Sequence, residues 1–88
     1  MTTPTIPTDL AALREEISEI NDALLELLSR RAHVATAIQR IKSREGIPTF
    51  VPEREQAMLV ELVRKNPGPF SNETVARLFK EIFAPASG

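Results

Sequence analysis

The sequence contains no cysteine, no tryptophan and no tyrosine, and it has a single histidine. Without cysteine the chain has no disulfide framework, no thiolate nucleophile and no thiolate metal site. No apolar run approaches the roughly 20 residues that a membrane-spanning helix needs. The chain begins with threonine and proline rather than with a basic and then apolar segment, so it lacks the pattern of a secretory signal. We therefore expect one cytoplasmic domain that does not enter a membrane.

The chain also has almost no excess of one charge over the other, because 11 basic and 12 acidic residues leave a formal net charge of −1. A balance so close to neutral argues against bulk electrostatic binding to nucleic acid or to an anionic membrane surface. His33 has no neighbour at metal-ligand spacing. The sequence therefore predicts neither a metal site nor a cofactor, and no nucleic-acid partner.

Glycine and proline are absent between Thr8 and Glu45, although the chain has three glycines and seven prolines. Within this stretch apolar residues recur at alternating steps of three and four, which is typical of a helical face that packs against other helices. Arg31 interrupts this apolar seam once. The seam consists of Leu10, Leu13, Ile17, Ile20, Leu24, Leu27, Arg31, Val34, Ile38 and Ile41. Thr8 is the predicted N-cap of this long helix, and Gly46 is its predicted C′ residue.

Two shorter helices are predicted after the long one. Pro52 suits the first position of the second helix, which ends before the Asn66-Pro67-Gly68-Pro69 loop. Ser71 is the predicted N-cap of the third helix, and Pro85 ends it. The predicted apolar faces are Met58, Leu59, Leu62 and Val63 on the second helix, and Leu78, Phe79, Ile82 and Phe83 on the third. We expect a helical domain over residues 8–84, with tails at residues 1–7 and 85–88.

The length of the first helix predicts an assembly. About 36 helical residues span roughly 54 Å, whereas a compact domain of this size is about 30 Å across. Two short helices cannot cover an apolar seam of that length. We therefore predict an all-α fold of one very long and two short helices, which forms an intertwined homodimer through the long helices.

Five charged residues form a candidate site. Arg31 lies in the apolar seam, so its charge needs an anion nearby. Lys42 follows eleven residues later, nearly on the same face and about 16 Å along the axis, which leaves room for a small anionic molecule. Arg14 lies about 25 Å from Arg31 and could join the site only from an antiparallel partner helix. Arg54 is a further candidate cation, and Glu55 beside it could accept a hydrogen bond from a hydroxyl group.

Each of these residues also has an ordinary structural explanation. Arg14 and Lys42 lie near the two ends of the long helix, where solvated cations are common. Arg54 and Glu55 could form one more exposed ion pair, which contributes little to stability. Arg31 could pair with Glu26, with Glu55 or with a carboxylate of a partner chain. From spacing alone, the sequence indicates a helical dimer with a candidate anion site.

The order and spacing of these motifs resemble the all-helical (AroQ-class) chorismate mutases, from Leu10 to about Phe83. The matching stretches are Leu13-Arg14-Glu15-Glu16-Ile17, then Arg31 with Lys42, then Pro52-Glu53-Arg54-Glu55 followed by Met58-Leu59. Two further stretches are most similar to the subgroup that is fused to, or works beside, DAHP synthase. They are Asn66-Pro67-Gly68-Pro69-Phe70 and Leu78-Phe79-Lys80-Glu81-Ile82-Phe83.

The resemblance implies a role for each residue of the site. Arg31 and Arg14 of the partner subunit would hold the two carboxylates of chorismate, and Lys42 would donate to the ether oxygen. Arg54 would add positive charge, and Glu55 would accept from the substrate hydroxyl. The remaining residues would be Val51, which presents its backbone N–H, and the apolar wall of Ile38, Met58 and Phe83. The product is prephenate, on the route to phenylalanine and tyrosine.

Two other functions stay open, and the first of them rests on a departure from the family pattern. Family members usually supply a Gln or Glu near the end of a longer third helix, whereas here Pro85 interrupts it and the sequence stops at Gly88. A non-catalytic module that binds chorismate or prephenate and regulates a DAHP synthase is one alternative. An isochorismate pyruvate lyase is the other, since that activity occurs on the same fold.

Overall fold

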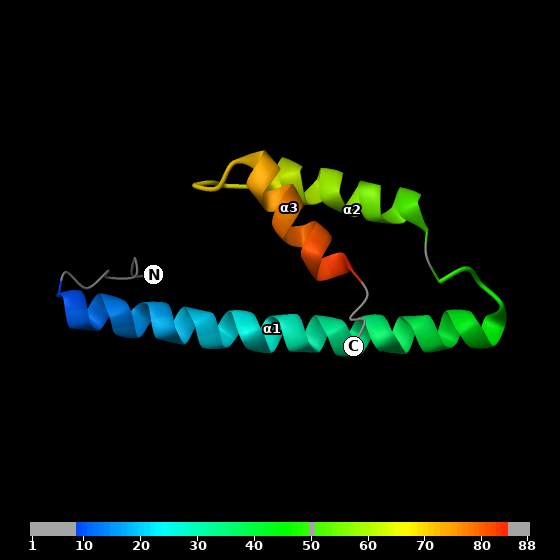
Figure 1. Ribbon diagram of the computed structural model, residues 1–88, viewed down its shortest axis with the longest axis horizontal. Helices are drawn as coiled ribbons and strands as arrows, with labels where there is room; N and C mark the ends of the chain where they lie inside the picture. The colour runs from blue at the N-terminus through cyan, green and yellow to red at the C-terminus, as the bar shows by residue number, and fades with distance from the viewer. Residues whose placement is uncertain (1–8, 50, 85–88) are drawn as a thin grey trace, which may run out of the picture. The chain divides into compact units, whose positions relative to one another are not determined.

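The computed structural model describes residues 9–49 and 51–84, and these residues form three α-helices (Figure 1). The helices are α1 (Leu10–Glu45), α2 (Pro52–Lys65) and α3 (Asn72–Phe83). Within the described ranges there is no strand, so the predicted all-α class with one long and two short helices is confirmed. The predicted tails, including Thr8 and Pro85, lie outside the described residues. No helix in the described part of the chain is long and apolar enough to cross a membrane.

The chain divides into two compact units. The first, Met1–Val34, contains the N-terminal part of α1. The second, Ala35–Gly88, contains the C-terminal part of α1 together with α2 and α3. The long helix therefore contributes residues to both units.

The first turn of α1 is capped by Asp9. Its Oδ2 accepts a hydrogen bond of 3.0 Å from the backbone N–H of Ala12, and its carbonyl accepts one of 2.9 Å from Leu13. A carboxylate in this place pairs an N–H group that has no partner inside the helix and interacts favourably with the helix dipole. The capping side chain thus lies one residue after Thr8, the residue predicted from the sequence.

The C-terminal end of α1 is a Schellman motif at Gly46. Ile47 donates its backbone N–H to the carbonyl of Lys42 at 2.8 Å, and Gly46 donates to Ser43 at 3.3 Å. Gly46 has a φ of +72°, which glycine adopts without the steric cost of a Cβ atom. The prediction that Gly46 is the C′ residue of the long helix is confirmed.

No described residue of α1 is buried. Apart from Leu13, which is half-buried, its large apolar side chains remain between 42% and 66% exposed. They include most of the predicted seam: Leu10, Ile17, Ile20, Leu24, Leu27, Val34, Ile38 and Ile41. Exposure of such a stripe to water is unfavourable, because burying apolar surface lowers the free energy by about 25 cal/mol per Å².

Helices α2 and α3 pack against each other as a hairpin. Leu59 of α2, at 7% exposed, is the only buried residue in the described part of the chain. Around it, Met58, Leu62 and Val63 of α2 and Val75, Phe79, Ile82 and Phe83 of α3 are half-buried. The rings of Phe79 and Phe83 lie with centroids 5.9 Å apart and planes tilted by 52°.

One member of the predicted apolar face of α3 remains exposed. Leu78 is 49% exposed, whereas its neighbour Phe79 is half-buried. Successive residues are about 100° apart around a helix, so a side chain next to the centre of a packed face lies at its flank. The main contact of α3 is with α2, and it leaves that flank open to solvent.

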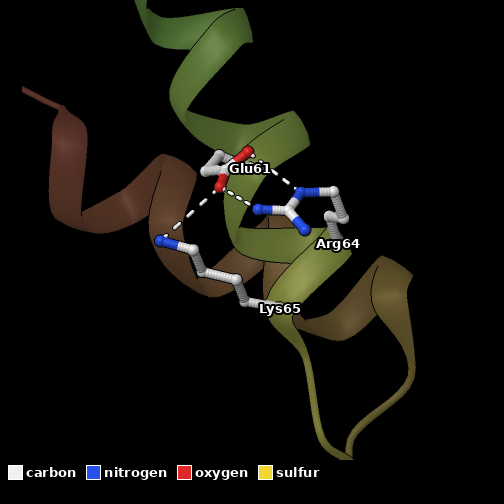
Figure 2. A network of polar contacts seen from close by, with 3 residues as sticks. All are labelled: Glu61, Arg64 and Lys65. Atoms are coloured by element: carbon white, nitrogen blue, oxygen red, sulfur yellow. Dashed lines mark hydrogen bonds and ion pairs between the residues drawn. The ribbon is translucent and has the colours of Figure 1, made fainter.

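The exposed side of α2 carries a small ion-pair network (Figure 2). Glu61 accepts hydrogen bonds from the Nε of Arg64, at 3.1 Å, and from one of its Nη atoms. Lys65 Nζ lies 3.5 Å from the same carboxylate. The hydrogen bond from Arg64, with the charge of Lys65, lowers the pKa of Glu61. All three side chains face solvent, so the network contributes little to stability.

Candidate active site

The structure distributes the predicted site residues over both units. Arg14 and Arg31 belong to the first unit, where Arg14 is exposed and Arg31 is half-buried. The other seven belong to the second unit: Ile38, Lys42, Val51, Arg54, Glu55, Met58 and Phe83. Half-burial of Arg31 is informative, because nearly every other residue of α1 is exposed. A desolvated guanidinium attracts an anionic partner more strongly than a fully solvated one.

The last turns of α1 place Ile38 and Lys42 on one face, since they are four residues apart. Lys42 is half-buried, and Ile38 is 45% exposed. The last-turn position of Lys42 is electrostatically favourable for a cation, because the carbonyl end of a helix carries partial negative charge. Lys42 is held in place at its backbone as well, by the Schellman bond from Ile47.

Helix α2 begins with an apolar N-cap. Val51 is extended, with φ −128° and ψ 99°, and forms no side-chain cap. Its carbonyl accepts hydrogen bonds from the N–H groups of Arg54, at 3.0 Å, and Glu55, at 3.4 Å. Pro52, at the first helical position, has no N–H to satisfy. The start of α2 therefore depends on proline and on acidic first-turn residues rather than on a capping side chain.

Glu55 and Met58 lie on the same side of α2, because they are three residues apart. Both are half-buried, whereas Arg54 is exposed. This part of α2 thus presents a carboxylate acceptor directly beside a flexible apolar side chain. Phe83, in the last turn of α3, is also half-buried and contacts the ring of Phe79.

Three of the predicted polar residues have no partner in the described part of the chain. Across residues 9–49 and 51–84, the side chains of Lys42, Arg54 and Glu55 form no hydrogen bond or ion pair. The alternative in which Arg54 and Glu55 pair with each other is therefore not what the structure shows. Lys42 and Glu55 are half-buried and have no partner among the residues that the structure describes, so they remain available to a ligand.

Sequence reasoning missed one polar residue that organises the second unit. The sequence indicated only a turn at Asn66, yet its side chain forms three hydrogen bonds. The available signal was the asparagine placed two residues before a glycine, since asparagine side chains commonly bond the backbone two residues on. No group of three His, Asp or Glu side chains in the described residues could hold a metal ion.

The chain matches known proteins over most of its length. The family model for chorismate mutase type II matches residues 13–86. The bifunctional chorismate mutase/prephenate dehydratase of Pseudomonas aeruginosa is 45% identical over 80 residues, which cover 85% of this chain and 22% of that protein. The chorismate mutase of Methanocaldococcus jannaschii is 38% identical over 56 residues, 64% of this chain and 56% of that protein.

A solved structure agrees with these relatives. Form I of the chorismate mutase from Thermus thermophilus aligns with a TM-score of 0.82 at 44% identity, and the alignment covers 84% of this chain and 92% of that one. The chain spans only 22% of the length of the bifunctional mutase/dehydratase relatives. Because the family match extends over well more than half of the sequence, this chain belongs to the chorismate mutase type II family.

Proposed function

We propose that this chain catalyses the rearrangement of chorismate to prephenate. The observation that carries the proposal is the pair Lys42 and Glu55, one cation and one carboxylate in the same unit, both half-buried and both without a protein partner among the described residues. Charged groups that are partly withdrawn from water need compensation by an opposite charge or a hydrogen bond. A small polar anion with a hydroxyl group meets the requirements of both.

The reaction is an intramolecular shift in which the ether C–O bond breaks as a C–C bond forms, with no atom gained or lost. It therefore needs no nucleophile. The protein must instead hold the substrate in its folded, reactive conformation. Arg31 and Arg14 of the partner subunit would do so by clamping the two carboxylates. Because the reaction is already intramolecular, the clamp would contribute by restricting the substrate to its reactive conformation rather than by bringing two molecules together.

Negative charge develops on the ether oxygen as the C–O bond breaks. Lys42 would donate a hydrogen bond to that oxygen, where a preorganised cation stabilises the transition state more than the ground state. Arg54 would add positive charge to the pocket, and Glu55 would accept from the substrate hydroxyl. Val51 would present its backbone N–H, while Ile38, Met58 and Phe83 would form the apolar wall.

We further propose that the chain acts as an intertwined homodimer. The support is the apolar seam of α1, in which eight large side chains between Leu10 and Ile41 are 45–61% exposed along a 36-residue helix. A second copy supplies a matching seam, so pairing of the two long helices would bury both. The same pairing would bring Arg14 of the partner subunit toward Arg31, which completes the carboxylate clamp.

The partner enzyme and the location remain predictions. The expected link to a DAHP synthase rests on the stretches 66–70 and 78–83 of this sequence. The bifunctional relatives named above carry a prephenate dehydratase instead. A location in the cytoplasm is consistent with a biosynthetic enzyme family.

A regulatory module is a second candidate, favoured by the end of α3. That helix stops at Phe83, with Ala84 as its C-cap, so no longer third helix contributes a polar side chain within the described residues. Such a module would bind chorismate or prephenate without converting either.

The deciding experiment follows the loss of chorismate absorbance with the purified chain, Arg31→Ala and Lys42→Ala. Arg30→Ala and Arg44→Ala are matched controls, because each removes an exposed neighbouring arginine of α1. We expect kcat/KM to fall at least about a hundredfold in the first pair, as for loss of a transition-state donor, and to stay unchanged in the controls.

Other outcomes identify the alternatives. Equal turnover in all four variants would contradict the assigned roles. Calorimetric binding of prephenate without turnover would favour the regulatory module. Release of pyruvate from isochorismate would favour the lyase.

A further inference from the structure

The loop between α2 and α3 is organised by one side chain. Asn66 is half-buried, and its Nδ2 donates to the carbonyl of Phe70 at 2.8 Å and to Oδ1 of Asn72 at 2.9 Å. Its Oδ1 accepts from the N–H of Gly68 at 3.0 Å. The amide thus uses both of its ends, and its contacts reach from the end of one helix to the first residue of the next.

These contacts join the two helices directly. Asn66 is the C-cap of α2, where its own N–H donates to the carbonyl of Val63 at 3.1 Å, and Asn72 is the first residue of α3. The other side-chain capping bonds at this junction stay at the start of α3: Ser71 Oγ accepts from the N–H of Thr74 at 3.2 Å and donates to its Oγ1 at 3.0 Å. Of these side-chain bonds, only those of the Asn66 amide connect α2 to α3 and can therefore constrain the angle between the two helices.

The packing of α2 against α3 constrains the angle between the two helices only weakly. Leu59 is the one buried side chain in the described residues, and the other apolar contacts of the hairpin are half-buried. A helix pair with so little buried surface can change its crossing angle at low cost. Hydrogen bonds at the point where the helices meet therefore carry a larger share of the orientation than they would in a well-filled core.

A small change at the loop becomes large at the other end of the hairpin. Helix α3 has 12 residues and is therefore about 18 Å long, so a rotation of about 5° at the loop moves its last turn by roughly 1.5 Å. Phe83 lies in that last turn, and Glu55 and Met58 lie on α2 about 12–16 Å from Asn66. A misplacement of about 1 Å in a site can cost on the order of a hundredfold in rate.

We propose that Asn66 is a positioning residue for the mutase site. It sets the angle between α2, which carries Glu55 and Met58, and α3, which carries Phe83, without touching the substrate itself. The inference rests on the proposed function, because it assumes that these three side chains serve one site.

The test uses Asn66→Asp in the full chain. Aspartate has the same size and can still accept from Gly68, but it cannot donate to Phe70 or Asn72. The probe is an oxabicyclic dicarboxylate that mimics the bridged transition state, titrated by calorimetry. We expect its Kd to rise roughly tenfold or more and kcat to fall by a similar factor, with unchanged binding stoichiometry.

Ser71→Ala is the matched control, since it removes the cap of α3 but no bond to α2. A merely structural role lowers the fraction of folded sites, so it reduces stoichiometry and Tm but leaves Kd per site unchanged. We expect that pattern for Ser71→Ala. An unchanged Kd in Asn66→Asp, or an equal loss of affinity in Ser71→Ala, would overturn the inference.

A second variant covers the case in which Asn66→Asp does not fold. Asn72→Ala removes a single acceptor of the amide, and we expect a smaller rise in Kd at unchanged stoichiometry; no rise would contradict the proposal. If the wild-type chain neither converts chorismate nor binds the analogue, the proposed function fails and the inference with it. A wild type that does both, beside an unaffected Asn66→Asp, contradicts the inference alone.

Discussion

The carbonyl of Val51 accepts the N–H of Glu55 at 3.4 Å, so an apolar N-cap begins the helix that carries the proposed substrate acceptor. Valine cannot pair the N–H groups at the start of a helix through its side chain. This end of α2 is therefore less stable than a helix start with a polar cap would be. It also carries Glu55, a residue of the proposed site.

Replacing this cap should stabilise α2. Val51→Asp supplies a carboxylate that can accept from the first-turn N–H groups and that suits the helix dipole. We expect the free energy of unfolding to rise by about 1 kcal/mol, measured by chemical denaturation followed by circular dichroism. Val51→Ala is the control, because it removes the same side chain without adding a cap. A rise in both variants would show that capping is not the cause.

The exposed seam of α1 should control association. Leu24→Glu places a charge in the middle of that seam, where Leu24 is 53% exposed in the single chain. We expect sedimentation equilibrium to show a dimer for the wild type and a monomer with a lower Tm for the variant, because burying an unpaired charge is costly. Ser29→Glu adds the same charge on the opposite side of the helix and should leave the dimer intact. Dimers of equal strength in both variants would exclude the seam as the interface.

Truncating the single buried side chain of the described residues should loosen the hairpin. Leu59→Ala removes the residue that is 7% exposed, and we expect a loss of about 2–3 kcal/mol in the free energy of unfolding. Leu59→Met keeps the volume and should cost less than about 1.5 kcal/mol. The free energy of unfolding of both variants is measured by thermal and chemical denaturation. If Leu59→Ala and Leu59→Met lose the same amount, side-chain volume at this position is unimportant.

The two carboxylates in the first turn of α2 should differ in function. Glu53 is exposed and Glu55 is half-buried, although both interact with the same helix dipole. We expect Glu55→Ala to lower kcat/KM for chorismate about tenfold or more, since a hydrogen bond to a charged group is worth about 1.5–3 kcal/mol. Glu53→Ala should match the wild type in steady-state kinetics. If Glu53→Ala lowered kcat/KM and Glu55→Ala did not, the role of hydroxyl acceptor would pass to Glu53.

The Glu61 network should respond to acid. The hydrogen bond from Arg64 lowers the pKa of Glu61 below its ordinary value of 4.5, so the folded state favours the ionised carboxylate. Its contribution is therefore present above pH 4.5 and is lost as the pH falls through the lowered pKa. We expect the small Tm difference between wild type and Glu61→Gln at neutral pH to disappear in acid. A difference that grows as the pH falls would contradict this pairing.

Local chemistry made the helix ends predictable from sequence. Pro52 begins α2 because it has no N–H to leave unpaired, Ser71 caps α3 through its own hydroxyl, and Gly46 ends α1 through its left-handed φ. Each of these depends on residues within a few positions in the chain. The seam of α1 was predictable for the same reason, since the helical period alone defines it.

Tertiary structure decided what depends on neighbours in space. The sequence placed Leu78 on the apolar face of α3, but the packing of α3 against α2 left it 49% exposed. The Asn66 amide was visible as a turn residue, yet its bond to Asn72 exists only because two helices meet there. The residue types of the candidate site followed from motif spacing, whereas the half-burial of Lys42 and Glu55 did not. Spacing along one chain determines which residues share a helix face, and only the packing of helices determines which of those faces lose contact with water.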